Sequence, residues 1–412
     1  MISVDEALKI ILDATETLPA QSIPIKSCTG KILAEDVIAE ENVPPFDNSA
    51  MDGYAVIASD VNTASREHPV SLQVIDIVQA GKVSDKKLNL GQTIQIMTGA
   101  PIPTNADAVV MAEQTEKTPD GKVKIFAPVL KNESLRFAGN DIKKGSVVFQ
   151  KGRLLKPYDT GVLASIGRPV VRITPKPRIA ILSTGDELSE IDRPLSPGKI
   201  RNSNNYVLQA LIGQMGAETI DLGIAQDTQK DTNIKLQKAF SADIIITSGG
   251  VSMGEFDFVR DTLKNIGVDI KFWKVKQKPG KPLVFGNHEK KLFFGLPGNP
   301  VSSVVCFELF VVPAIKKMSG MTDLEPCQIK AESEELIKKK PGLRHFLRGI
   351  VRKENNRLRV TTTQNQSSGA MSSLSAANCL IDLPEEKEDV LPGEIVSIIL
   401  LDTGIFEKWY CG

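Results

Sequence analysis

Apolar and polar positions alternate in a strand–helix pattern from about residue 177 to residue 320. Short apolar runs that end in small or polar residues indicate buried strands that lead into loops. They lie at 179–182, 219–224, 244–247 and 292–296. Stretches with apolar residues at helical spacing lie at 206–215, 231–240, 256–266 and from 301 onward, with a kink expected at Pro313. This order predicts a parallel, doubly wound α/β domain.

The two flanks have a different pattern. Residues 46–131 are rich in Val, Ile and Thr and contain several turn signals with glycine, so we expect a β-rich module there. Residues 326–412 also contain short strand-like runs, including 357–363 and 394–401, which predict a small C-terminal β-barrel or sandwich. The first 45 residues and about 132–172 show no clear periodicity.

The first residues predict a helix and not an export signal. Ser3 and Glu6 have the spacing of a capping box, and residues 7–14 that follow are amphipathic. Elsewhere, no uninterrupted apolar run approaches the roughly 18–20 residues that span a bilayer. We therefore expect a cytoplasmic protein without a membrane partner.

Charge and cysteine usage narrow the classes of function. Fifty basic residues balance fifty acidic ones, and this zero net charge argues against an extended nucleic-acid surface. We expect no nucleic-acid partner, although a local basic pocket is compatible with this balance. Five cysteines are dispersed without a Cys-x-x-Cys pair, which suits neither a disulfide framework nor a zinc site.

Three predicted strand-to-helix loops carry groups suited to anionic ligands. In an open α/β sheet, ligands bind beyond the carboxyl ends of the strands, where glycines allow close approach and helix N-termini favour anions. The loops are Ser183-Thr184-Gly185-Asp186-Glu187, Ser248-Gly249-Gly250-Val251-Ser252 and Pro297-Gly298-Asn299-Pro300-Val301-Ser302-Ser303. Any one of them alone is more often an ordinary turn and helix cap. None is a Walker A motif, and no Gly-x-Gly-x-x-Gly opens a helix.

Four carboxylates lie beside these loops: Asp186, Glu187, Asp227 and Asp257. Hard oxygen ligands near phosphate suit Mg²⁺, which usually binds one or two carboxylates together with substrate oxygens. The alternative for any single carboxylate is a helix cap or a solvated surface position.

Basic residues form two further candidate sites for an oxyanion. Lys276, Lys278 and Lys281 surround a proline-rich turn, which fixes the backbone and so the placement of the charges. Arg344 and Arg348 lie four residues apart and share one face of either a helix or a strand. Paired guanidinium groups suit phosphate or molybdate, and solvated surface charge is the alternative.

Several short motifs, taken in chain order, resemble the MoeA/gephyrin E-domain family. They are Ser49-Ala50-Met51-Asp52-Gly53-Tyr54-Ala55, Met97-Thr98-Gly99-Ala100-Pro101, 183–188, 248–257, 278–282, 295–303 and Arg344-His345-Phe346-Leu347-Arg348-Gly349. Each motif is short, but together they cover nearly the whole chain, in one order and at matching separations.

The resemblance implies a multidomain α/β protein that forms an elongated homodimer. Its expected parts are a discontinuous linker and dimerisation domain (1–45 with 132–172), a β-rich domain (46–131), a central MogA-like molybdopterin-binding α/β domain (173–325) and a C-terminal β-barrel (326–412). The implied reaction inserts molybdenum from molybdate into adenylylated molybdopterin, with release of AMP and with Mg²⁺ as cofactor. A MogA-like adenylyltransferase is the implied donor of the adenylylated pterin.

Matching by motif also implies roles for individual residues. The catalytic set is Asp52, Thr98, Glu187, Asp227 and Asp257; the first two are expected to reach the site from the partner subunit, and the last three to hold the metal or position the pyrophosphate. Residues expected to bind the pterin phosphate or the oxyanion are Ser183, Thr184, Ser248, Gly249, Gly250, Lys278, Lys281, Pro282, Pro297, Gly298, Asn299, Ser302, Arg344, Arg348 and Ser373. No covalent nucleophile is needed, because the dithiolene sulfurs of the pterin bind the metal.

Other functions remain open at this point. One is a gephyrin-like scaffold that binds a peptide partner, and another is a tungstate-inserting paralogue. A third is a pyridine-nucleotide hydrolase with a related central domain, although the motifs around Asp52 and Thr98 favour the MoeA family over the hydrolase. Molybdate and tungstate have nearly the same size and charge, and no residue in the sequence separates them.

Overall fold

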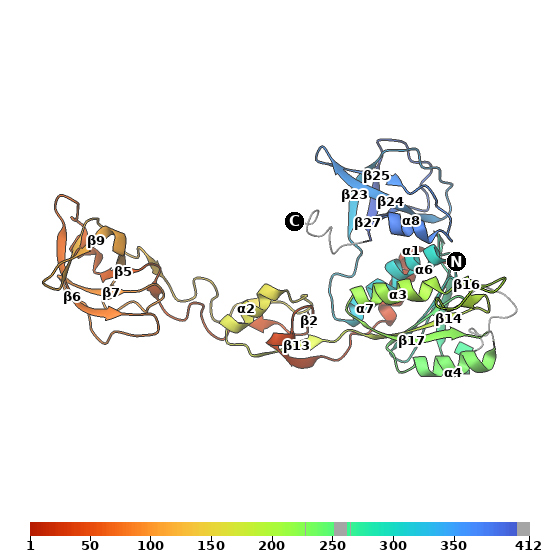
Figure 1. The fold of residues 1–412 in the computed structure, drawn as a ribbon, viewed down its shortest axis with the longest axis horizontal. Coiled ribbons are helices and arrows are strands. Elements are labelled where there is room, and N and C mark those ends of the chain that lie inside the picture. Colours follow the sequence, from red (N-terminus) through yellow and green to blue (C-terminus); the bar gives the residue numbers. More distant parts are fainter. Residues whose placement is uncertain (227, 251–261, 264, 402–412) are drawn as a thin grey trace.

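The computed structural model describes residues 1–226, 228–250, 262–263 and 265–401. The chain is elongated (Figure 1). The β-rich module lies at one end, a small module follows in the middle, and the α/β domain with the C-terminal module lies at the other end. Within one chain, the middle module therefore separates the β-rich module from the α/β domain (Figure 1).

The α/β domain is built on a six-stranded sheet with the order β17-β14-β18-β22-β21-β19. Its strands are β14 (Arg178–Thr184), β17 (Glu218–Ala225), β18 (Ile244–Ser248), β19 (Asp269–Lys274), β21 (Pro282–His288) and β22 (Lys291–Leu296). The first four strands in this order are parallel to one another, as predicted. The prediction of an all-parallel sheet fails at β21, which is antiparallel to β22 and β19. Only two residues connect β21 to β22, which is too short for a crossover helix.

Helices cover both faces of this sheet, which confirms the doubly wound architecture. Alternate residues of β18 enter two separate cores: Ile244 and Ile246 face one, and Ile245 faces the other. The first core also contains residues of α1 (Val4–Ala14), α3 (Ser203–Gln214), α6 (Pro300–Cys306) and α7 (Val312–Met318). The second contains residues of α4 (Gln229–Ala239). Most of the helix predicted over 256–266 lies outside the described residues.

Two local features differ from the sequence-based expectation. The helix α1, capped by Ser3 as predicted, packs in the core of the α/β domain and not in the linker domain to which 1–45 were assigned. The long helix from 300 to 318 contains a π-helical turn at Phe307–Val311 directly before Pro313. A proline has no N–H for the preceding turn, and the wider π turn accommodates that loss.

The other two modules are mostly short strands. The middle one has the sheet β1-β13-β2 (Gln21–Pro24, Val170–Thr174, Ile32–Leu33), the pair β3 and β12 (Val37–Ile38, Val147–Phe149), the 3₁₀ turn Ile25–Ser27 and α2 (Pro157–Ser165). The β-rich one has the sheet β8-β5-β7-β6-β10-β9 (Ala108–Met111, Gly53–Val56, Gln92–Ile96, Val70–Val78, Lys122–Ile125, Thr115–Lys117) and the 3₁₀ turns Ala58–Val61 and Ala112–Gln114. The pair β4 and β11 (Asn48–Ser49, Leu135–Arg136) lies where the two modules join.

The C-terminal module is a closed five-stranded barrel, as predicted. Its strands follow the order β24-β25-β23-β27-β26, and β26 pairs back with β24 (Arg344–Glu354, Arg357–Thr362, Gln328–Ser333, Ile395–Leu400, Cys379–Leu383). The short strand β20 (Gln277–Lys278) of the α/β domain adds to β24 from outside. Phe346, Leu380 and Ile399 of the barrel extend into the first core of the α/β domain, so the two are docked through apolar packing.

The small parallel pair β15 and β16 (Leu188–Ser189, Ile200–Arg201) and the short helix α8 (Met371–Ala376) complete the described elements. Within the described ranges, no helix is long and apolar enough to cross a membrane.

Candidate active site

The three predicted loops meet at the carboxyl edge of the parallel strands. Ser183 at the end of β14 is in register with Ser248 at the end of β18, which is in register with Leu296 at the end of β22. A Cβ atom on Gly298 would lie 3.8 Å from the Cα of Gly249, so the second and third loops are in close proximity. The structure therefore brings together the residues that the sequence placed in separate loops.

Gly249 allows the backbone of two loops to approach closely. Its φ is +89°, and a Cβ atom there would lie 2.5 Å from the carbonyl oxygen of Thr184. Only glycine tolerates both conditions, because an L side chain is strained at this φ and would overlap the backbone. Gly250 follows with a φ of +64° and is exposed. The N–H of Gly249 donates to the carbonyl of Leu296 (3.1 Å), which ties the second loop to the end of β22 and leaves Gly250 as the exposed residue of the pair.

Two asparagines that sequence reasoning missed hold the loops in place. The Asn204 amide donates to the hydroxyl of Ser248 (2.8 Å) and to the carbonyl of Gly298 (2.9 Å). The hydroxyl of Ser183 donates to the side-chain oxygen of Asn202 (2.9 Å). Both asparagines are buried at the start of α3. The signal in the sequence was the run Arg201-Asn202-Ser203-Asn204-Asn205, which is indistinguishable from an ordinary helix cap.

The lysine turn packs onto α6. Gly280 has a φ of +89°, and a Cβ atom there would lie 2.6 Å from the Sγ of Cys306 and 3.4 Å from the carbonyl oxygen of Ser302. The lysines on either side, Lys278 and Lys281, are exposed. Close packing of the turn therefore places both lysines beside α6, whose first residues belong to the third loop. Pro282 continues the chain into β21.

Arg348 is the most deeply buried cation of the predicted set. It is 1% exposed, and its Nε donates to the hydroxyl of Ser373 (3.1 Å). One Nη donates to the carbonyls of Asn365 (3.2 Å) and Ser367 (3.1 Å). Burial lowers the pKa of Arg348. No carboxylate in the described part of the chain lies within ion-pair distance of it, so its positive charge is not neutralised by those residues.

The loop that holds Arg348 also contacts α6. The backbone N–H of Val301 donates to the carbonyl of Ser368 (3.0 Å), one residue from an Arg348 partner. Ser302, which follows, is buried at the same helix start. Asn299 is exposed at the N-cap, and Pro297 is buried behind it. The barrel, the lysine turn and the loop after β22 thus converge on one region.

Arg344 does not join Arg348 in a paired guanidinium site. Its Nε and one Nη form a two-bond ion pair with Asp382 (2.8 and 2.7 Å), and its other Nη contacts Asp5 (2.8 Å). The hydrogen bonds and charge of Asp382 raise the pKa of Arg344. Two carboxylates already take three of the five N–H donors of this guanidinium and balance its charge, so Arg344 is part of an ion-pair cluster and not of an oxyanion site with Arg348. Alternation along β24 places both arginines on one face as predicted, but their partners differ.

The carboxylates predicted to hold a metal are only partly described. The Glu187 carboxylate folds over Gly185 beyond the end of β14, where it is exposed beside the loops. Asp227 and Asp257 lie outside the described residues. Among the residues that are described, no three His, Cys, Asp or Glu side chains form a metal-binding group. Even as a single carboxylate, Glu187 fits the pattern by which Mg²⁺ binds one or two carboxylates together with phosphate oxygens.

Asp52 and Thr98 form a separate polar pair in the β-rich module. The N–H and hydroxyl of Thr98 both donate to one oxygen of Asp52 (2.6 and 2.8 Å). These bonds lower the pKa of Asp52, the backbone bond having the larger effect. The pair is exposed and lies beside β5, at the opposite end of the chain from the α/β loops (Figure 1). One chain therefore does not bring these two residues to the other predicted site residues.

Comparison with known proteins places this arrangement in a family. The family models for the MoeA N-terminal region (domain I and II), a probable molybdopterin binding domain and the MoeA C-terminal region (domain IV) match residues 2–167, 180–317 and 330–401. The chain belongs to the MoeA family. The resemblance drawn from the motifs is thereby confirmed.

Curated MoeA relatives match along nearly the entire chain. A molybdopterin molybdenumtransferase of Staphylococcus aureus (strain MRSA252) is 36% identical over 411 residues, which cover 99% of this chain and 97% of that protein. One from Haemophilus influenzae is 37% identical over 407 residues, or 97% and 98% of the two chains. The crystal structure of a molybdopterin biosynthesis MoeA protein from Pyrococcus horikoshii has a TM-score of 0.84 at 31% identity and covers 98% of this chain and 99% of that one.

A glycine in the MoeA motif around Asp52 gives a direct stability prediction. Gly53 in β5 lies opposite Met111, and a Cβ atom there would overlap the carbonyl oxygen of Val110. Because backbone cannot yield cheaply, we expect Gly53→Ala to destabilise the β-rich module by about 3 kcal/mol and to displace Asp52. Thermal unfolding measures this change. The control Gly161→Ala, in α2 with open space around it, should leave stability equal or slightly higher; equal melting of both variants would contradict the prediction.

His345 gives a prediction on pH dependence. Burial, and then the charges of Lys339 and Lys278, lowers the pKa of His345 from 6.5 to about 4. The unfolded chain therefore binds more protons between these values, so stability is full above pH 6.5 and falls as the pH drops toward 4. We expect His345→Gln to reduce the slope of the unfolding free energy against pH by an amount that corresponds to up to about one proton. Urea unfolding of both proteins from pH 7 to pH 4 measures this slope. The prediction would be wrong if the unfolding free energies of the two proteins changed with pH in parallel.

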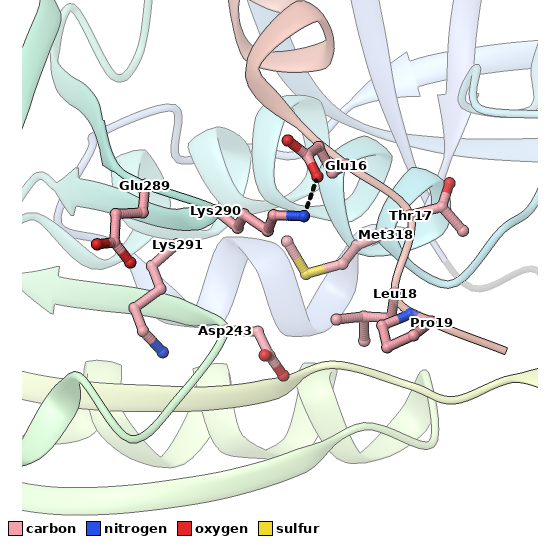
Figure 2. Close-up of a pocket in the computed structure, with 9 residues that line it drawn as sticks. All are labelled: Glu16, Thr17, Leu18, Pro19, Asp243, Glu289, Lys290, Lys291 and Met318. Atoms are coloured by element: carbon pink, nitrogen blue, oxygen red, sulfur yellow. Dashed lines mark ion pairs between the residues drawn. The ribbon is translucent and has the colours of Figure 1, made fainter. Parts of the chain in front are cut away.

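A pocket of about 460 Å³ lies at the other edge of the MoeA α/β sheet (Figure 2). It is lined by Glu16, Thr17, Leu18, Pro19, Asp243, Glu289, Lys290, Lys291 and Met318. Lys290 forms an ion pair with Glu16 (2.9 Å), and Lys291 donates to a backbone carbonyl. Asp243 and Lys291 lie at the amino ends of β18 and β22, so this pocket is at the edge opposite to the loops.

Proposed function

We propose that this protein is a molybdopterin molybdenumtransferase that inserts molybdenum from molybdate into adenylylated molybdopterin and releases AMP. The observation that carries the proposal is Arg348: a buried cation bonded to Ser373, without a carboxylate partner in the described part of the chain, beside the helix start that follows β22. Burying such a charge is costly unless an anion compensates it. The names of the curated relatives specify which anion to test.

The lysine turn supports an oxyanion site of this kind. Lys278 and Lys281 are exposed and fixed by a turn that packs onto α6, so their charges have a defined position. Molybdate is a dianion, and two ammonium groups with one guanidinium would replace its hydration shell. Holding the oxyanion beside the dithiolene of the pterin converts a bimolecular encounter into a step within the bound complex.

The loop edge of the sheet supports binding of the pterin phosphates. The buried hydroxyl of Ser248 accepts from the Asn204 amide, so its own O–H can donate to a ligand, and the exposed Gly250 beside it lets a phosphate approach the backbone closely. The Thr184 hydroxyl is buried and has no partner among the described atoms, which leaves a donor available. Such donors stabilise the charge that gathers on phosphate oxygens when the phosphoanhydride to AMP breaks.

Glu187 would hold Mg²⁺ at this edge, with Asp227 and Asp257 as further proposed ligands. When bound, the cation would offset negative charge on the phosphate oxygens during loss of AMP. Glu187 itself would fix the position of the pyrophosphate relative to the loops, because its carboxylate already lies over Gly185.

The site as proposed is shared between two subunits of a homodimer. Hydrogen bonds from Thr98 lower the pKa of Asp52, which lies at the far end of its own chain, and in this proposal a second copy supplies it. An ionised carboxylate that faces the oxyanion pocket would accept a proton from a thiol of the pterin as its sulfur bonds molybdenum, and would pass that proton to the molybdate oxygen that leaves as water. The adenylylated pterin would come from a MogA-like adenylyltransferase in the cytoplasm.

The test is AMP release from the purified protein. Adenylylated molybdopterin and Mg²⁺ are supplied with molybdate, with tungstate, or with neither, and the bound molybdenum is quantified after gel filtration. We expect AMP release that depends on molybdate and is lost in Asp52→Ala. Release with tungstate alone would redefine the substrate, and no release from folded protein with either oxyanion would overturn the enzymatic proposal in favour of a binding protein.

A further inference from the structure

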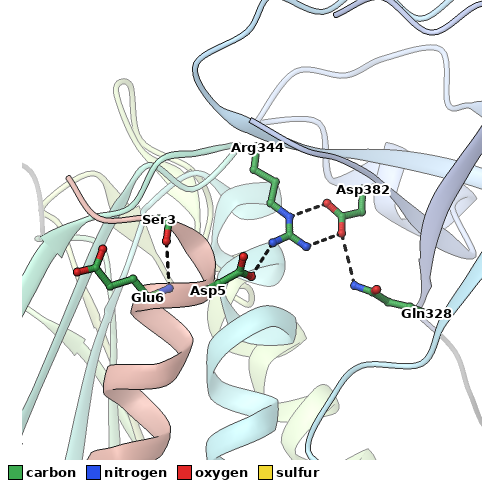
Figure 3. Close-up of polar contacts among 6 residues, drawn as sticks. All are labelled: Ser3, Asp5, Glu6, Gln328, Arg344 and Asp382. Atoms are coloured by element: carbon green, nitrogen blue, oxygen red, sulfur yellow. Dashed lines mark hydrogen bonds and ion pairs between the residues drawn. The ribbon is translucent and has the colours of Figure 1, made fainter. Parts of the chain in front are cut away.

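Arg344 lies at the junction of three segments that are far apart in the sequence (Figure 3). Its guanidinium bonds Asp382 of the barrel through two parallel contacts and Asp5 of α1 through a third. Asp382 also accepts from the amide of Gln328 on β23. The ring of Phe346, two residues along β24, lies 5.4 Å from the guanidinium carbon and is part of the core shared by the barrel and the α/β domain.

The backbone of Arg344 is attached to the lysine segment. Its N–H donates to the carbonyl of Lys276 (3.0 Å), and β20 continues from there in register with β24, with Gln277 opposite Arg344 and Lys278 opposite His345. On the other side, the N–H of Lys276 donates to the carbonyl of Ile2 (2.9 Å). The lysine segment is thus held between the N-terminal segment and the first residues of β24.

The two acidic partners of Arg344 differ in their surroundings. The Asp382 side chain is 5% exposed, whereas that of Asp5 is 84% exposed. An ion pair with planar two-bond geometry and little solvent fixes orientation strongly, whereas an exposed pair is screened and contributes little. Asp382 is therefore the partner that sets the direction of the Arg344 side chain, and Asp5 is a matched exposed contact of the same guanidinium.

We propose that Arg344 is a positioning residue for oxyanion binding: its ion pair with Asp382 anchors the first residue of β24 to β26, and the backbone of that residue in turn holds the strand that carries Lys278 in register with the strand that carries Arg348. This inference rests on the proposed function, because it assigns Lys278 and Arg348 to the oxyanion. Arg348 lies four residues beyond Arg344 on the same strand, about 13 Å along β24. A shift of β20 against β24 at Arg344 therefore changes the distance between the two cations that the oxyanion has to bridge.

The experiment compares Asp382→Asn, Arg344→Lys and the control Asp5→Asn with wild type. Asp382→Asn removes the charge and one acceptor from the buried pair, and we expect the KM for molybdate to rise about 10-fold while kcat stays within about twofold. Arg344→Lys keeps the charge but loses the two-bond geometry, and an intermediate rise is expected. Asp5→Asn should stay within about twofold of wild type in both constants.

A second readout is independent of catalysis. Hydrogen exchange of the full-length protein, followed by mass spectrometry, should show faster exchange in 276–282 and 344–348 for Asp382→Asn than for Asp5→Asn, with the barrel strands β25 and β27 unchanged. An unchanged KM for molybdate, or exchange that rises uniformly over the barrel, would overturn the positioning role in favour of a structural one. If wild type inserts no molybdenum, the proposed function fails, and the exchange pattern alone decides whether Arg344 fixes the register.

Discussion

Subunits with Asp52→Ala and subunits with Arg348→Met restore each other's activity when they are paired in one dimer. Each homodimer is expected to be inactive, because every site lacks one of the two residues. In the mixed dimer, one site combines Arg348 of the first subunit with Asp52 of the second, and about half of the wild-type activity returns. Co-expression with two different tags isolates the mixed dimer, and molybdate-dependent AMP release measures its activity.

The control places both substitutions in one subunit and leaves the other subunit as wild type. A double variant with both changes in one subunit, paired with a wild-type subunit, loses both sites if each site is shared, since every site then has one substituted residue. If each site instead lies within one chain, this dimer keeps half of the activity, whereas the dimer of single variants has none. The two designs thus predict opposite results, and a protein that sediments only as a monomer would also contradict the shared site.

The sequence was informative wherever a local pattern decides the structure. Apolar runs predicted the strands around Ile179 and Ile244, because strands buried on both faces of a sheet are continuously apolar, and helical spacing predicted the helix over 206–215. The loops after these strands were also predictable, since the carboxyl ends of parallel strands meet at one edge. The helix α1 was predicted too, but an amphipathic stripe does not specify which domain covers it.

The arginines show why part of the site was not predictable. Arg344 and Arg348 are the same residue type, four positions apart on one face of a strand, yet their partners are unrelated. Asp382 and Asp5 lie 38 and 339 positions from Arg344, and only the tertiary fold brings them together. Asn204 was missed for a similar reason. Its partners in the two loops lie 44 and 94 positions away, whereas its local sequence is that of an ordinary helix start.

Substitution of the two arginines should separate activity from stability. Arg348→Met is expected to lower kcat/KM for molybdate about 100-fold, because a charge-assisted contact to the oxyanion is lost. Arg348→Lys should recover only part of this loss, since an ammonium cannot bond Ser373 and the two carbonyls in the same geometry. The initial rate of AMP release as a function of molybdate concentration measures both variants.

Stability should respond in the opposite order. Arg344→Met leaves Asp382 buried without its cation, and breaking such a pair costs about 3 kcal/mol. Arg348→Met removes a buried charge that lacks an acidic partner among the described residues, so relief of desolvation offsets the lost hydrogen bonds and the unfolding midpoint should change little. A residue kept for ligand binding contributes little to the stability of the fold or lowers it. If Arg348→Met instead lost much stability and kept full activity, Arg348 would be assigned a structural role in the barrel.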